Sequence, residues 1–175
     1  NIIIKKPSVL EALSRIQTVL FDKTGTLTLG EPRLESVRVF DKNIDEDHAI
    51  VIAAAIELHS LHPHARALTA ERARRKLADL PALKVEEKIG SGISGEVEGT
   101  RYELRKAKDA VARGIALDML RGGDTVAQFF FEDQPKANVA EFIGHMKNNY
   151  SVALITGDKQ ENADALFGSL GMKIH

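Results

Sequence analysis

The segment Asp22 to Thr28 reads Asp-Lys-Thr-Gly-Thr-Leu-Thr and combines a carboxylate, hydroxyl groups and a glycine. It follows the mostly apolar run 16–21, which predicts a buried strand ending at Asp22. A carboxylate at a strand end can attack a phosphoryl group and form an acyl phosphate, which divides one difficult transfer into two easier ones. Asp22 is therefore the predicted nucleophile. The alternative is a plain turn in which Asp22 and the threonines bond to their own backbone.

The residues after Asp22 suit the charge that such a transfer develops. Backbone N–H groups around Gly25, with the hydroxyls of Thr24 and Thr26, are donors for phosphate oxygens. Lys23 either adds a positive charge or is simply exposed. Seven specified residues match by chance on the order of once in 10⁹ positions, so we interpret the segment as a phosphorylation loop.

A second polar triplet, Thr156-Gly157-Asp158, follows the apolar run 151–155. Polar residues at the carboxyl ends of parallel strands share one sheet edge, where open α/β sheets place their chemistry. Taken alone, Thr-Gly-Asp is equally typical of a helix cap. Helical spacing predicts helices over 8–15 and 139–146 and after Asp158 as far as Leu170, so the two ends of the chain are expected to form one parallel α/β domain.

The middle of the chain has a different pattern. Asp45 is placed to cap a helix that runs to about residue 59, and Pro63 to open a second helix to about residue 77. Val37 and Val39 alternate with polar residues, as in a strand. Short strands are expected over 85–89, 95–99 and 101–104, with one more helix over 107–120. These elements predict an α+β insert with an antiparallel sheet.

Composition excludes several classes of function. Lys and Arg number 24 against 25 Asp and Glu, so no global field attracts nucleic acid or an anionic membrane. The absence of cysteine excludes disulfides, thiolate metal sites and cysteine nucleophiles. The longest apolar run, 49–56, is far shorter than the ~20 residues of a membrane span. We expect the chain to be soluble and monomeric, and its start at Asn1 suggests a piece of a longer protein.

On its heptapeptide the chain resembles the P-type ATPases, whose signature is Asp-Lys-Thr-Gly-Thr in a domain of haloacid dehalogenase type. The resemblance implies a parallel-sheet phosphorylation domain, residues 1–32 and 132–175, interrupted by an α+β nucleotide-binding domain, residues 33–131. Within the first domain, Thr156, Gly157 and Asp158 match the family's Thr-Gly-Asp. Asp133 and Lys136 match its hinge aspartate and the basic residue three positions later.

The resemblance also implies roles for these residues. The γ-phosphate of ATP passes to Asp22, Thr156 holds a phosphate oxygen, and Asp133 lies near the magnesium and the nucleotide. The backbone carbonyl of Thr24 joins Asp22 in binding Mg²⁺, so ATP and Mg²⁺ are the expected cofactors. The expected partners are ATP and the transmembrane and actuator domains of the parent protein, at the cytoplasmic face of a membrane.

Glu57 and His62-Pro63 resemble the nucleotide motif of the heavy-metal-transporting branch of this family. Pro63 disfavours helical geometry at His62, which leaves the imidazole at a helix start, where it can stack on adenine. Two alternatives stay open: an ordinary capping histidine, or a metal site made by His59, His62 and His64.

Gly90 and Gly92, in the segment Gly90 to Gly95, resemble the glycine-rich loop of the same branch. There the missing Cβ atoms let the backbone approach the nucleotide; the alternative is a hairpin turn without a ligand. The chain departs from the branch at Arg105-Lys106, where a glycine, often followed by asparagine, is usual. An arginine there could crowd adenine or reach phosphate.

The chain stops at His175, before the Gly-Asp-Gly-x-Asn-Asp-x-Pro loop of the family and its upstream lysine. We therefore expect a C-terminally truncated phosphorylation domain that binds nucleotide with little or no turnover. A soluble haloacid-dehalogenase-type phosphatase or phosphotransferase is an alternative, although Thr24 stands where such enzymes carry an acid. A nucleotide-binding module without catalysis is another. Copper, zinc, cadmium and cobalt all stay open as the transported ion.

Overall fold

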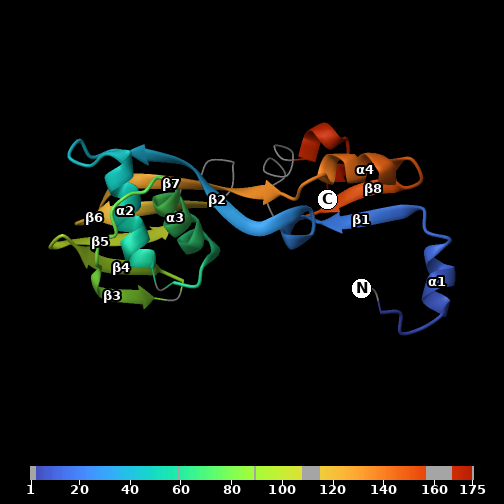
Figure 1. Cartoon of the computed structure of the whole chain (residues 1–175), viewed down its shortest axis with the longest axis horizontal. Coiled ribbons are helices and arrows are strands. Elements are labelled where there is room, and N and C mark those ends of the chain that lie inside the picture. Colours follow the sequence, from blue (N-terminus) through green and yellow to red (C-terminus); the bar gives the residue numbers. More distant parts are fainter. Residues whose placement is uncertain (1–2, 59, 89, 108–114, 157–166, 175) are drawn as a thin grey trace. The chain divides into compact units, whose positions relative to one another are not determined.

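Figure 1 shows the fold of the chain as a computed structural model. The structure describes residues 3–58, 60–88, 90–107, 115–156 and 167–174. The chain separates into two compact units. The first unit comprises Asn1–Leu29 and Pro135–His175, and the second comprises Gly30–Gln134.

The first unit is built on a parallel sheet in the order β1-β8-β9. β1 (Thr18–Asp22) pairs with β8 (Ser151–Ile155), which pairs in turn with β9 (Lys173–Ile174). α4 (Val139–Lys147) packs against β8, whereas α1 (Ser8–Leu13) buries none of its side chains. The parallel pairing of the two predicted strands is confirmed.

The core of the first unit lies on one face of this sheet. Its buried side chains are Leu27, Val139, Ile143, Val152, Leu154, Phe167 and Met172. On the opposite face, Leu20 and Ile155 are 54% and 45% exposed. Because parallel sheets are ordinarily covered on both faces, the described part of this unit presents an unusual amount of apolar surface to solvent.

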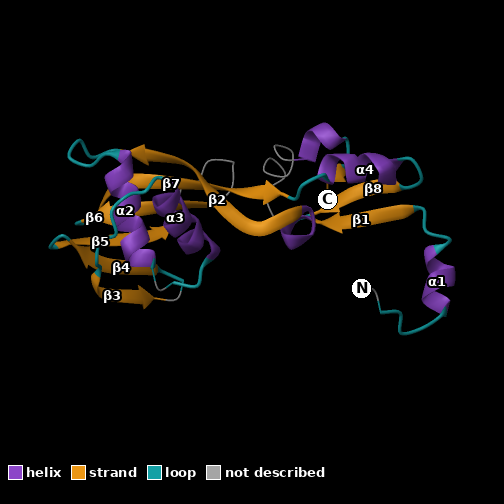
Figure 2. Ribbon diagram, in the orientation of Figure 1, coloured by secondary structure: helices purple, strands orange, loops and turns teal. Residues whose placement is uncertain are grey.

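The second unit is a six-stranded sheet with two helices on one face (Figure 2). The strand order is β2-β7-β6-β5-β4-β3, and the pairs from β7 to β3 are antiparallel. The helices are α2 (Glu46–Glu57) and α3 (Pro63–Arg74). The strands are β2 (Thr28–Val39), β3 (Leu83–Lys88), β4 (Gly92–Val97), β5 (Thr100–Lys106), β6 (Ile115–Arg121) and β7 (Asp124–Pro135).

Local signals account for both helices. The side chain of Asp45 accepts a hydrogen bond from the His48 N–H at 2.7 Å, which caps the first turn of α2. Pro63 is the first residue of α3, where its missing N–H costs nothing. Residues 49–57 of α2 are all buried. This explains why the sequence is apolar along this stretch and has no polar face.

The core of the second unit lies between the sheet and the two helices. Its fully buried large side chains include Ile50, Ile52, Ile56, Leu68, Leu104, Met119, Phe129 and Phe131. Burial of such side chains is the main favourable term in folding. This core is much larger than that of the first unit, and it fixes the end of α2 against the sheet.

A network of ion pairs joins α2 to α3. Arg75 contacts Glu46 at 2.7 Å and Asp47 at 2.8 Å on α2, and Glu71 at 2.6 Å on α3. Arg74 donates two hydrogen bonds of 2.7 Å to the same Glu71 carboxylate. These hydrogen bonds, that of Arg74 first and then that of Arg75, lower the pKa of Glu71 to about 2. The network therefore stabilises the helical hairpin mainly while Glu71 is ionised.

The structure corrects part of the predicted insert. The helix predicted over 107–120 is wrong for residues 115–120, which belong to β6 between β5 and β7. Residues 116–120 are all buried, and a strand covered on both faces shows no alternation that would distinguish it from a helix. The strand predicted over 95–99 begins earlier, at Gly92, and β7 was not predicted at all.

The fold class is the predicted one. A parallel α/β sheet and a separate antiparallel sheet covered by helices are both present. Within the described ranges, no helix is long and apolar enough to cross a membrane.

Candidate functional site

Asp22 lies at the end of β1, and its side chain is exposed. The next residues, Lys23–Leu27, form one wide π-type turn in which Thr24 is extended and Gly25 has φ of +76°. The left-handed conformation is readily accessible only to glycine, which explains Gly25 at this position. Thr24 and Thr26, both in this turn, are exposed.

Thr28 closes this turn from inside the protein. Its hydroxyl, fully buried, donates to the Lys23 carbonyl at 3.3 Å and accepts from the Gly25 N–H at 3.2 Å. The Gly25 N–H therefore binds Thr28 and is not a free donor for a phosphate oxygen. The sequence had suggested that donor, and the structure assigns it to shaping the loop.

Lys136 holds the turn from a distant part of the chain. Its Nζ donates to the Gly25 carbonyl at 2.7 Å, and its backbone N–H donates to the Leu27 carbonyl at 2.9 Å. The resemblance had implied Lys136 only as the basic partner of Asp133. Two hydrogen bonds from one residue fix the loop relative to the segment that leads into α4.

The two predicted strand-end motifs meet at one sheet edge. In the parallel pair of β1 and β8, Asp22 is the register partner of Ile155, so Thr156 follows directly opposite the start of the Lys23–Leu27 turn. Gly157 and Asp158 lie outside the described residues. The structure thus brings Asp22 and Thr156 to adjacent strand ends, as expected for open α/β sheets.

The loop has the oxygen donors that Mg²⁺ prefers. The carbonyls of Lys23, Gly25 and Leu27 accept hydrogen bonds that hold the turn. An exposed carboxylate at Asp22 and a backbone carbonyl at Thr24 are hard oxygen ligands of the kind Mg²⁺ takes together with water and substrate phosphates. These two residues therefore fit the ion.

In the second unit, Glu57 is a buried carboxylate at the end of α2. Only 2% of its side chain is exposed, and its Oε1 lies 3.2 Å from Nε2 of His64. Its other oxygen, Oε2, is buried and has no hydrogen-bond partner among the described residues. A buried carboxylate oxygen without a donor is costly, so this atom is a candidate acceptor for a ligand.

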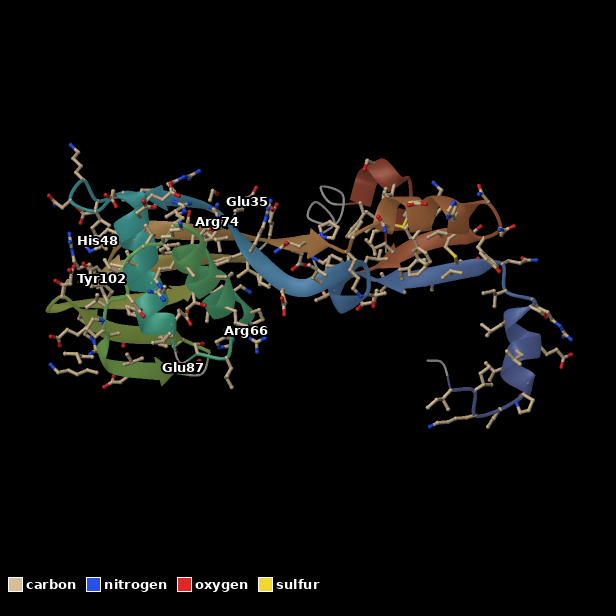
Figure 3. The ribbon with its side chains drawn as sticks, viewed as in Figure 1. Glu35, His48, Arg66, Arg74, Glu87 and Tyr102 are labelled. Carbon is tan, nitrogen blue, oxygen red and sulfur yellow. The ribbon has the colours of Figure 1, made fainter. Side chains whose placement is uncertain are left out.

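His62 stands at the start of α3, next to this carboxylate. Its ring stacks on that of His64, with centroids 5.1 Å apart and planes at 12°. Its Nε2 lies 3.2 Å from Oε1 of Glu87 on β3, and its side chain is 60% exposed. Figure 3 shows Glu87 and Arg66 at the end of the unit where α2 ends and α3 begins. One face of the His62 ring is thus supported and the ring is otherwise accessible.

The contact with Glu87 links His62 to the glycine-rich hairpin. Glu87 is the register partner of Ile93, and the next pair joins Lys88 to Gly92. Gly90 lies in the turn with φ of +78°, whereas Gly92 is already the first residue of β4. The structure therefore brings Glu57, His62 and the hairpin of Gly90 and Gly92 together.

Gly92 has a packing role that Gly90 lacks. A Cβ atom on Gly92 would lie 2.2 Å from the Leu104 carbonyl oxygen and 3.1 Å from the Cβ of Arg105, whereas no atom of the described residues, chain neighbours aside, lies within 4 Å of one on Gly90. Arg105, which replaces the usual glycine of the branch, thus lies against Gly92 on β5. Its Nε is buried without a hydrogen bond among the described residues.

Two cavities lie in the second unit, and the described residues that line them do not include Glu57 or His62. One of about 560 Å³ opens beside the hairpin at Lys88, Ser91 and Gly92. The other, of about 740 Å³, is lined by Leu61 and Pro63, which flank His62 in the sequence, and by Arg66.

The remaining predicted residues take other places. Asp133 lies near the end of β7 and belongs to the second unit, whereas Asp22 belongs to the first. The alternative metal site included His59, which lies outside the described residues. Among the residues that are described, no three His, Cys, Asp or Glu side chains are grouped to hold a metal ion.

Sequence reasoning missed three contacts. His64 was considered only as a metal ligand, Glu87 only as part of a strand, and Lys136 only as a partner of Asp133. No helical or strand spacing predicts the contact between His64 and Glu57, because the chain reverses direction between α2 and α3. Its one signal was the unusual density of histidines around Pro63.

Comparison with known proteins shows the family of the chain. Residues 16–175 match the haloacid dehalogenase-like hydrolase family. The chain is 32% identical over 193 aligned residues to a copper-exporting P-type ATPase of Legionella pneumophila, which covers 99% of this chain and 26% of that protein. The chain thus spans about a quarter of the length of that curated relative.

Solved structures give the same result. A crystal structure of a zinc-transporting PIB-type ATPase in the E2·Pi state matches with a TM-score of 0.81 and 30% identity, covering 95% of this chain and 30% of that one. The catalytic domain of the CPx-ATPase CopB-B, in a study of its conformational changes upon nucleotide binding, matches with a TM-score of 0.82 and 26% identity, covering 99% and 66%. The chain therefore belongs to the haloacid dehalogenase-like hydrolase family, and its homologues are heavy-metal P-type ATPases.

Proposed function

We propose that the chain is the ATP-binding and phosphorylation region of a heavy-metal-transporting P-type ATPase, with Asp22 as the phosphate acceptor. The observation that carries the proposal is the exposed carboxylate at the end of β1, in a loop shaped by Gly25 and Thr28. Its homologues include copper and zinc transporters, which supports a heavy-metal cation as the cargo.

In the proposed transfer, a carboxylate oxygen of Asp22 forms a bond to the γ-phosphorus of ATP. The bond from that phosphorus to the oxygen bridging the β-phosphate breaks, and ADP leaves with the electron pair. The product is an acyl phosphate, which water later hydrolyses. Thr156, on the adjacent strand end, donates its hydroxyl to a phosphate oxygen, with Gly157 and Asp158 assigned to the same loop by resemblance.

Other residues of the loop serve positioning and charge. Lys136 and Thr28 hold the loop so that Asp22 need not reorganise during the transfer. Asp22 and the Thr24 carbonyl would hold Mg²⁺, which would supply positive charge to the phosphate oxygens. Lys23 and Asp133 are assigned to the phosphate and nucleotide environment by resemblance alone.

The nucleotide is proposed to bind in the second unit. The accessible face of the His62 ring stacks on the base, and the backbone at Gly90 and Gly92 approaches the nucleotide from the hairpin. The unpaired Oε2 of Glu57 accepts a hydrogen bond from the base, which requires a donor such as the 6-amino group of adenine. This requirement favours ATP over nucleotides that carry a 6-oxo group.

The parent protein is proposed to be a membrane pump with this region at the cytoplasmic face. Its transmembrane and actuator domains are then the partners that convert phosphorylation of Asp22 into ion movement. The chain by itself is proposed to bind ATP with little or no turnover.

Nucleotide binding can be tested on the chain itself. ATP is titrated into ¹⁵N-labelled wild type, His62→Ala and Glu57→Ala while amide shifts are followed. The proposal predicts amide shifts in the β3–β4 hairpin and at the α2–α3 junction of the wild type. It also predicts that each variant binds ATP at least about tenfold more weakly than the wild type. Equal affinities in the three proteins, or shifts confined to other regions, would contradict it.

A further inference from the structure

His64 has no role in the nucleotide binding proposed above, but it contacts Glu57, His62 and Phe131. It lies in the first turn of α3, and only 16% of its side chain is exposed. Its Nε2 faces Oε1 of Glu57 at 3.2 Å. Its ring stacks on His62 and also meets Phe131 of β7, with centroids 6.0 Å apart and planes at 52°.

The contact with Glu57 decides which carboxylate oxygen is available. His64 contacts Oε1, whereas the buried Oε2 has no hydrogen-bond partner among the described residues and is left to accept from a ligand. The carboxylate is also prevented from rotating, since turning it would break the contact with His64. A buried, oriented acceptor binds a donor more strongly than a mobile one, because no conformational freedom is lost on binding.

The stacking contact decides the orientation of His62. The His62 side chain is 60% exposed and would otherwise sample several rotamers. His64 supports one face of its ring, and Glu87 engages its Nε2 from β3 at 3.2 Å. Phe131, fully buried in the core, supports His64 in turn. The ring of His62 is therefore connected through His64 to the rigid sheet.

We propose that His64 is a positioning residue of the nucleotide site: it orients the Glu57 carboxylate and the His62 ring for the base, without touching the nucleotide. The proposal rests on the proposed nucleotide binding by Glu57 and His62. A site that is held in its binding geometry by rigid neighbours loses affinity when those neighbours are removed, even if its own residues are intact.

Two substitutions separate the two roles. His64→Phe keeps a ring for His62 to stack on but removes the nitrogen that faces Glu57. His64→Gln keeps a donor for Glu57 but removes the ring. The control is His48→Gln, which makes the same substitution in a similar pair, between His48 and Glu98 at 2.9 Å, at the opposite end of α2 (Figure 3). Urea unfolding of each variant shows that it is folded before binding is measured.

Two readouts apply to the free and the ATP-bound chain. The first is the Hε1 resonance of His62 in the free protein, which senses the ring current of its stacked neighbour. We expect it to move downfield in His64→Gln and to stay near its wild-type position in His64→Phe and His48→Gln. The second is ATP affinity, which we expect to fall about tenfold in both His64 variants and to be unchanged in His48→Gln.

The outcomes distinguish this inference from the function on which it rests. If His62→Ala weakens ATP binding but neither His64 variant does, the positioning role is wrong and the site stands. If His62→Ala binds ATP like wild type, the site itself is wrong. If the His62 resonance does not move in His64→Gln, the positioning role is wrong, whatever the ATP affinities are. If His64→Phe does not fold, His64→Gln alone is enough for this test.

Discussion

Replacing Gly92 by alanine should destabilise the chain far more than the same change at Gly90. The new Cβ on residue 92 would lie 2.2 Å from the Leu104 carbonyl oxygen, more than an ångström inside ordinary contact distance. That oxygen belongs to the backbone of β5 and cannot move without disturbing its ladder with β4. Gly92 also has φ of +138°, a region nearly closed to residues with a side chain.

The magnitude follows from these two terms. Forcing an extra carbon into a packed site costs about 1–3 kcal/mol, and the backbone strain adds about 1–3 kcal/mol, so about 2–6 kcal/mol is expected in total. At Gly90 the space is open and only the left-handed conformation is penalised, by about 1–2 kcal/mol. Each variant adds one methyl group to the wild type, and the two positions are two residues apart in the same hairpin.

Urea unfolding of both variants, followed by far-UV circular dichroism, measures the difference. The slope against urea should be unchanged, so that a shift in midpoint reports stability. We expect Gly92→Ala to lose about 2–3 kcal/mol more than Gly90→Ala, the difference between the middles of the two ranges. Equal midpoints for the two variants would refute the close approach of β4 to Leu104, and with it the register that places the hairpin beside His62.

Three further predictions follow from other contacts. Asp45→Ala should cost about 1 kcal/mol in urea unfolding, because it removes the cap of α2, whereas Asp45→Asn should cost much less. The pKa of Glu71 is lowered to about 2 from an ordinary 4.5, so its contribution to stability is fully present above pH 4.5 and is lost as the pH falls toward 2. Over that range the difference in unfolding free energy between wild type and Glu71→Gln should shrink by about 1–2 kcal/mol. A constant difference would show that the network does not depend on charge. In hydrogen exchange, β1 and β8 should exchange faster than the strands of the second unit, since Leu20 and Ile155 are uncovered, and maximal protection of β1 and β8 in a monomeric sample would contradict this.

Some of the fold could be predicted from sequence because its signals are local. The cap at Asp45 and the start of α3 at Pro63 depend on neighbouring residues only. The strand before Asp22 and the strand before Thr156 each end in a polar motif, and parallel pairing then places both motifs at one edge. These elements need no knowledge of what covers them.

The strands β6 and β7 were not predicted because their sequences do not alternate between apolar and polar residues. In β7, Phe129 and Phe131 enter the core while Phe130 lies on the other face, where the Arg38 guanidinium stands 5.6 Å from its ring centroid. Three consecutive aromatic residues therefore show no alternation, although the strand uses both faces. The burial of β6 on both faces had the same effect on the prediction of residues 115–121.

The candidate site was only partly predictable for a similar reason. Glu57 and His62 could be named from a motif, but their orientation depends on His64, Glu87 and Phe131, which come from three different elements. The role of Gly92 likewise depends on Leu104, which is distant in sequence and adjacent in the sheet. Contacts of this kind follow from tertiary packing and leave no local pattern.

Phosphorylation of the longer protein that we propose contains this chain is the most direct test of the central claim. The protein is incubated briefly with γ-³²P-labelled ATP and Mg²⁺, quenched in acid and separated at low pH, with Asp22→Asn and Asp45→Asn as the test variant and its matched control. The account predicts an acid-stable, hydroxylamine-sensitive label in wild type and Asp45→Asn that is absent from Asp22→Asn. Label of the same amount and chemistry in Asp22→Asn would show that another residue accepts the phosphate, and would contradict the account.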